Sequence, residues 1–138
     1  EIKETVDRIQ ILAYKKRYLQ LLQQIQIDWA ATYLNLFLTI DQNPLREFIF
    51  QELMKNGKTI DVETKLEQML VEPHHYANAF LWYFQKIMEK GKVPYSSQEG
   101  KNRFLESLFA LLYVLEQYPN ERENVKKILN IFRQIALR

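Results

Sequence analysis

Apolar residues recur at intervals of three and four residues along most of this sequence, which is the spacing of one face of an α-helix. The widest run lies between Phe104 and Leu115, and its breadth predicts a central helix with Leu111 fully buried. No segment sustains the alternation of apolar and polar residues that a half-buried strand requires. The pattern therefore predicts an all-α fold.

Capping residues and helix breakers divide this pattern into about seven helices. The expected N-terminal caps are polar residues that can accept hydrogen bonds from the first turn, and they are Asp28, Asn43, Asp61, Ser96 and Asn120. The expected C-terminal signals are Asn56-Gly57 and Lys90-Gly91. Because the connections are short, sequential helices should be antiparallel neighbours in a bundle or an irregular α-α superhelix. We expect a single helical domain over residues 1–138.

The first helical segment contains two apolar stripes that lie on nearly opposite faces of a straight helix. The first stripe consists of Ile2, Val6, Ile9 and Ala13, and the second consists of Ile11, Tyr14, Tyr18, Leu22 and Ile25. A helix break near Tyr14 would fold the first turns back onto the domain. A continuous helix would instead leave the first stripe for a neighbour, and on that interpretation Ile2, Val6 and Ile9 form a candidate partner surface.

Composition agrees with a helical domain and excludes several classes of protein. The chain has 138 residues, of which 47% are hydrophobic, and only three are Gly and four are Pro, too few for the turns of a sandwich or barrel. There is no Cys, which excludes disulfide scaffolds and Cys-based zinc sites. No apolar run reaches the roughly 18 residues of a membrane span, so we expect a cytoplasmic protein. Because Glu1 is not a Met and helix is expected at both ends, we expect a fragment of a longer protein.

The sequence contains no arrangement that predicts catalysis, a metal or a cofactor. His74 and His75 are adjacent and so point about 100° apart on a helix, whereas a zinc-binding helix places its two His four residues apart. The carboxylates are scattered through polar faces and caps, and isolated glycines cannot build a phosphate-binding loop. We therefore expect a protein that is not an enzyme, with no catalytic residues, metal ligands or cofactor.

An aromatic run at Phe80–Phe84 covers every face of a helix. Most of these rings are expected in a helix packed on several sides. Trp82 lies off the stripe of its helix, and Trp and Tyr are enriched at protein interfaces. Trp82 and Tyr83 are therefore further candidates for a partner surface.

The tightest basic run is Lys15, Lys16 and Arg17. Such a run can contact phosphate groups, but it is also what a solvated helix face looks like. The net charge of +2 does not favour nucleic acid as the partner. The three residues are retained as candidate basic contacts.

Two helical segments, Leu81–Lys86 and Arg103–Leu108, resemble the helical region of the long Gre-type transcript cleavage factors of chlamydiae and related bacteria. Those factors also carry a coiled-coil hairpin with acidic residues at its tip and a β-rich domain, neither of which is found here, so no functional residue can be carried over. The resemblance implies an accessory domain of a transcription elongation factor.

Two functions follow from these observations. The first is a non-catalytic interaction or scaffolding module of a larger cytoplasmic protein, whose protein partner could be RNA polymerase or the rest of the parent chain. The second is an accessory helical domain of a bacterial elongation factor that acts near RNA polymerase or nucleic acid. No membrane contact is expected.

Overall fold

The computed structural model of the chain describes residues 2–137, except for the side chain of Leu66, and it contains no strand within that range. The predicted all-α fold is confirmed. Contacts between residues group the chain into two compact units, Glu1–Lys65 and Leu66–Arg138.

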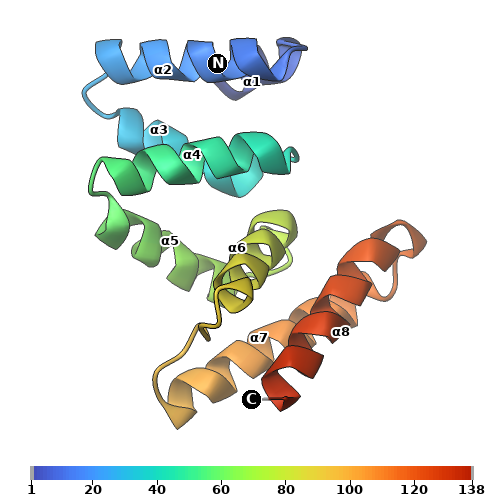
Figure 1. Ribbon diagram of the computed structural model, residues 1–138. Helices are drawn as coiled ribbons and strands as arrows, with labels where there is room; N and C mark the ends of the chain where they lie inside the picture. The colour runs from blue at the N-terminus through green and yellow to red at the C-terminus, as the bar shows by residue number, and fades with distance from the viewer. Residues whose placement is uncertain (1, 138) are drawn as a thin grey trace. The chain divides into compact units, whose positions relative to one another are not determined.

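Eight α-helices and one 3-10 helix occur in the described residues (Figure 1). They are α1 (Ile2–Arg8), α2 (Leu12–Ile25), α3 (Trp29–Thr39), α4 (Asn43–Lys55), α5 (Thr59–Val71), α6 (Ala77–Glu89), α7 (Gln98–Leu115), η1 (Pro119–Glu121) and α8 (Arg122–Ala136). The count exceeds the expected one because the first predicted helix is two helices in the structure. The first unit contains α1 to α4, and the second contains α6 to α8.

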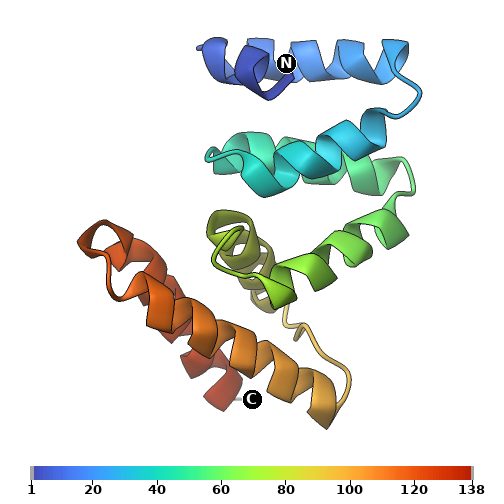
Figure 2. The ribbon, with the colours of Figure 1, turned by 180° about the vertical axis from the view of Figure 1, so that it is seen from behind.

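The first unit is built on the antiparallel hairpin of α3 and α4, which is visible from both sides in Figures 1 and 2. Helix α2 packs on this hairpin through Leu19 and Leu22, which are both buried. The Tyr33 hydroxyl donates a hydrogen bond of 2.7 Å to the Leu19 carbonyl and accepts one of 2.8 Å from Gln23. Burial raises the pKa of Tyr33 to about 12, because the charged form would lose its hydration.

A buried arginine holds the turn between α3 and α4. Arg46 is completely buried, and its guanidinium donates hydrogen bonds to the carbonyls of Phe37 and Ile40 and to the side chain of Asn43. Burial lowers the pKa of Arg46 to about 10, an effect that Asp41 partly opposes. The hydrogen bonds satisfy carbonyl groups at the end of α3 that have no partner within the helix.

The first predicted helix breaks after Arg8 and forms two separate helices, α1 and α2. Val6, predicted to face a partner, is 0% exposed and lines the same cavity as Ile40 and Leu45. Ile2 and Ile9 are half-buried. The prediction of an exposed first stripe is wrong for Val6, because the break turns this residue toward the core of the first unit.

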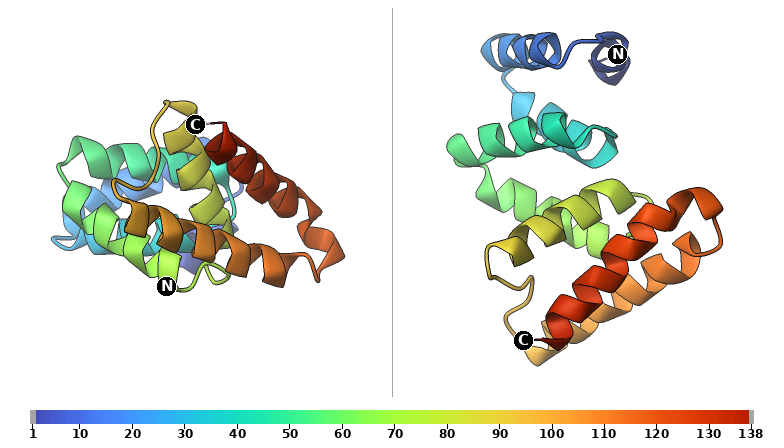
Figure 3. Two further views of the ribbon diagram at one scale, coloured as in Figure 1. Left: turned by 90° about the horizontal axis from the view of Figure 1, so that it is seen from below. Right: turned by 45° about the vertical axis from the view of Figure 1, so that its right-hand side comes forward.

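The second unit is centred on rings from α6 and α7. Phe84 contacts Phe80 at 4.7 Å and Phe104 at 4.8 Å between ring centroids. Leu111 is 0% exposed, as predicted. Helices α7 and α8 form a second hairpin, which Figure 3 shows from two sides. The buried face of α8 carries Ile128, Ile131 and Ile135.

The predicted helix ends are confirmed at both glycine signals, since Gly57 and Gly91 have φ of 74° and 79°, values that favour glycine. The predicted caps are less accurate. Ser97 rather than Ser96 caps α7, and its hydroxyl accepts a hydrogen bond of 3.0 Å from the backbone of Gly100. Asn120 lies inside η1 and does not cap α8.

Candidate protein-interaction surfaces

The predicted basic run does not form one surface. Lys15 is only 3% exposed, which contradicts its assignment as a basic contact, because its position on α2 turns it toward the core together with Leu19. The ammonium group of Lys16 lies 5.7 Å from the centre of the Phe48 ring. Of the three predicted residues, only Arg17 is exposed.

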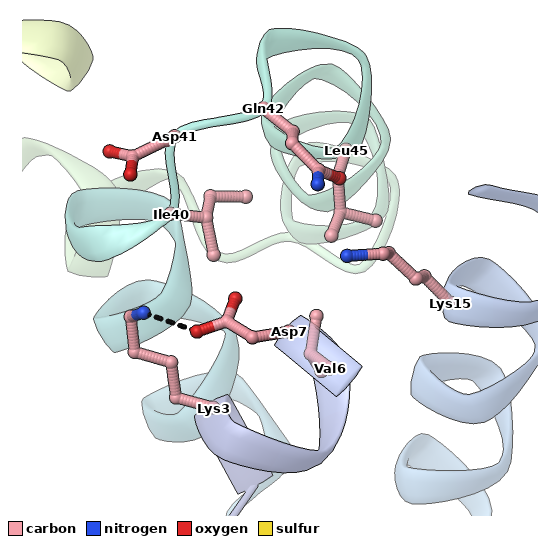
Figure 4. Close-up of a pocket in the computed structure, with 8 residues that line it drawn as sticks. All are labelled: Lys3, Val6, Asp7, Lys15, Ile40, Asp41, Gln42 and Leu45. Carbon is pink, nitrogen blue, oxygen red and sulfur yellow. Dashed lines mark hydrogen bonds and ion pairs between the residues drawn. The ribbon is translucent and has the colours of Figure 1, made fainter. Parts of the chain in front are cut away.

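Lys15 lines a cavity of about 140 Å³ in the first unit (Figure 4). The cavity also contains Asp41 and the pair of Lys3 with Asp7, whose charged groups are 2.7 Å apart. Two basic and two acidic side chains balance one another here. The cavity therefore offers no excess of positive charge that would attract nucleic acid.

Trp82 and Tyr83, the aromatic candidates on α6, are both half-buried. The Lys86 ammonium lies 5.1 Å from the Trp82 ring, and the Tyr83 ring packs edge-on against Phe84 at 5.2 Å. Part of each side chain is thus engaged within the second unit. Their contact with a partner stays a prediction.

A row of apolar residues on α2 is exposed instead. We call it the α2 row, and it consists of Ile11, which caps the helix, followed by Tyr14, Tyr18, Leu21 and Ile25. The exposed fractions are 53% for Ile11, 63% for Tyr14, 42% for Leu21 and 75% for Ile25. The second predicted stripe included Leu22 in place of Leu21, and Leu22 is buried. The row follows the alternating spacing of three and four residues that is typical of helix pairing, a signal already present in the sequence.

The second unit has its own exposed apolar surface, along the α7–α8 hairpin. We call it the α7–α8 seam, and it consists of Phe109, Tyr113, Leu129 and Phe132. The rings of Phe109 and Phe132 are 4.6 Å apart and connect the two helices. Phe109 is 59% exposed, Tyr113 69% and Leu129 52%, and Phe132 is half-buried. The sequence pattern did not identify the seam.

Charged residues at the edges of the seam differ between its two helices. Helix α7 contributes Glu106 and its C-terminal cap contributes Glu116, and helix α8 contributes Lys126 and Arg133, all of them exposed. Lys126 also lies 3.4 Å from Glu123 on its own helix. The seam thus has an apolar centre, an acidic edge and a basic edge.

The part of the chain that the structure describes has no group of three or more His, Cys, Asp or Glu that could hold a metal ion. His74 and His75 are exposed, and His75 lies 4.0 Å from Glu72. Tyr33 and Arg46, whose pKa values are clearly shifted, are both used in hydrogen bonds that join helices. Among residues 2–137, no helix has the length and apolar character needed to cross a membrane.

Comparisons with known proteins agree with the resemblance drawn from the sequence. A family model described as "GreA-associated C-terminal domain" matches residues 1–136. The transcription elongation factor GreA of Chlamydia trachomatis serovar D is 27% identical over 90 residues, which cover 64% of this chain. The matched segment spans only 13% of the length of that relative. No solved structure matches the chain.

Proposed function

The chain belongs to the family of GreA-associated C-terminal domains, and we propose that it is a non-catalytic protein-interaction domain of a transcription elongation factor. The observation that carries the proposal is the α7–α8 seam. Its exposed aromatic and aliphatic side chains lie together on one hairpin, and soluble proteins seldom expose large apolar patches that have no binding role. Aromatic side chains are also enriched at protein interfaces.

The proposed partner of the seam is RNA polymerase. The relative of this chain from Chlamydia trachomatis is named as a transcription elongation factor, and such a factor must act on the enzyme that transcribes. The acidic edge on α7 and the basic edge on α8 would fix the orientation of a partner surface with the opposite order of charges. This function places the protein in the cytoplasm of a bacterial cell.

Nucleic acid is a weaker candidate for the partner. Lys15 is buried and Lys16 lies over Phe48, so the basic run does not present a row of positive charges to a phosphate backbone. Nucleic-acid binding draws most of its affinity from such contacts. An apolar seam with charges of both signs is better suited to a protein surface.

The proposal is tested by titrating labelled chain with RNA polymerase from the organism that encodes it. The double variant Phe109→Ser/Leu129→Ser should bind at least about tenfold more weakly, since loss of well-buried interface side chains costs more than about 1 kcal/mol each. Val71→Ser is the matched control, because Val71 is 80% exposed and lies outside the seam.

The control variant should bind with a Kd within about twofold of the wild-type value. A loss of about 1.4 kcal/mol of binding free energy would raise the Kd tenfold. Far-UV circular dichroism should show that all three proteins keep their helical content. Equal binding by the wild type and the double variant, or absence of binding by the wild type, would exclude the seam as the polymerase contact.

A further inference from the structure

The α2 row is a second apolar surface, in a different unit from the α7–α8 seam. We infer that it docks an amphipathic helix from another part of the same polypeptide, so that α2 and this helix pair side by side. The inference rests on the proposed function, because it requires the chain to be one domain of a longer elongation factor. It assigns to the first unit a binding role that is separate from the polymerase contact proposed for the second unit.

The face of α2 that forms the row differs from the face that packs on the hairpin of α3 and α4. The packed face carries Lys15, Leu19 and Leu22. The row is set about a quarter-turn away from these residues, given about 100° of rotation per residue. Helix α2 therefore has two apolar faces, and the described residues cover only one of them.

The spacing of the row indicates what kind of element would cover the exposed face. Intervals of three, four, three and four residues from Ile11 to Ile25 are those of the seam between paired helices, in which side chains of one helix insert between those of the other. Helix α2 has 14 residues and is thus about 21 Å long. A docked helix of three to four turns would match this length.

The size of the row argues against a second copy of the chain as the occupant. A stable interface buries roughly 800 Å² on each partner. Of the five side chains in the row, Tyr18 is half-buried and the other four are between 42% and 75% exposed. Since even a large aromatic side chain buries only about 150–250 Å² when fully covered, these partly exposed residues fall short of that area.

A helix in the same polypeptide does not need so large a contact. Tethering raises its effective concentration to the millimolar range for short flexible linkers, so a small apolar seam suffices. The relative from Chlamydia trachomatis is much longer than the segment that matches this chain, which spans 13% of it. A factor of that size has ample sequence outside the domain to supply the helix.

The charge beside the α2 row indicates which polar residue the docked helix should carry. Arg17 is exposed and lies three residues after Tyr14 and four before Leu21, so its guanidinium is beside the row. Gln10 and Gln24, also exposed, are neutral. The docked helix should therefore carry apolar residues at alternating intervals of three and four, with an acidic residue placed to face Arg17.

Photo-crosslinking in the complete elongation factor tests this inference. The crosslinking residue p-benzoylphenylalanine is placed at Tyr14 or, in a second variant, at Ile25, and a matched control carries it at the exposed Gln20 on another side of α2. A mixture of ¹⁴N- and ¹⁵N-labelled protein separates links within one chain from links between copies. RNA polymerase is left out, so the result does not depend on the polymerase contact.

The expected result is crosslinks from positions 14 and 25 to one helix of the same isotope label, at apolar residues spaced by three and four. Position 20 should give at least about fivefold less of this product. Products of mixed isotope label would identify a second copy as the occupant and overturn the inference. Equal yields from all three positions, or no crosslink from positions 14 and 25, would also overturn it.

Discussion

At the residue scale, Arg46 shows how a charge can be kept in the core of a small helical unit. Its guanidinium is planar and carries five N–H donors, so one side chain can reach two carbonyls and an amide oxygen at the same turn. Without it, the carbonyls of Phe37 and Ile40 would lose these partners. A buried acceptor without a partner costs free energy. The stability of this turn therefore depends on the Arg46 side chain.

We predict that Arg46→Ala lowers the free energy of unfolding of the first unit by more than about 1.5 kcal/mol, the lower end for one hydrogen bond to a charged group. The chain has two Trp residues, one in each unit, so Trp29 fluorescence in a Trp82→Phe background reports on the first unit. Arg17→Ala is the control. Because Arg17 is exposed, its replacement should change stability by less than about 0.5 kcal/mol.

The sequence did not predict that Arg46 and Lys15 are buried. Whether a long basic side chain points to water or into the protein depends on the tertiary partners that the chain brings near it. For Arg46 those partners are carbonyl groups of the preceding helix, and every residue has such a group. The identity of the side chain alone therefore carries no signal of this contact.

At the scale of elements, apolar periodicity and the two glycine signals predicted the helices well, because these signals act within one or two turns, whereas the N-terminal caps were predicted less accurately. Leu111 is buried as expected, and Gly57 and Gly91 end their helices. The break between α1 and α2 was left open, since no Pro or Gly occurs there. Val6 is buried beside a cavity that Ile40 and Leu45 also line, and these residues are more than 30 positions away in the chain.

The exposed surfaces were predicted less well, for a related reason. A helix with two apolar faces, such as α2 or α8, does not reveal in its sequence which face the rest of the domain covers. The α2 row and the α7–α8 seam both consist of residues that resemble core positions in spacing and type. The tertiary packing decides which of these faces stays exposed.

The cap of α7 gives a prediction at this scale, because Ser96 and Ser97 are adjacent and only Ser97 accepts a hydrogen bond from the first turn. Ser97→Ala should destabilise the second unit by about 1 kcal/mol, the usual cost of losing an N-terminal cap. Ser96→Ala should change stability by less than about 0.5 kcal/mol. Denaturation followed by Trp82 fluorescence in a Trp29→Phe background compares the two, and equal losses would contradict the assigned cap.

At the scale of the whole molecule, the chain combines two helical units, each with an exposed apolar surface. We propose that these surfaces serve two different contacts. The seam on the second unit binds RNA polymerase, and the α2 row on the first unit binds another helix of the elongation factor. An accessory domain of this kind would hold the factor and the polymerase together.

Hydrogen–deuterium exchange of the chain, alone and in complex with RNA polymerase, tests the polymerase contact most directly. The account predicts slower exchange in the complex for the amides of residues 105–116 and 125–136, which carry the seam and its charged edges. Residues 12–25 of α2 should exchange at an unchanged rate. Slower exchange centred on Lys15–Arg17, with none along the α7–α8 hairpin, would contradict the account.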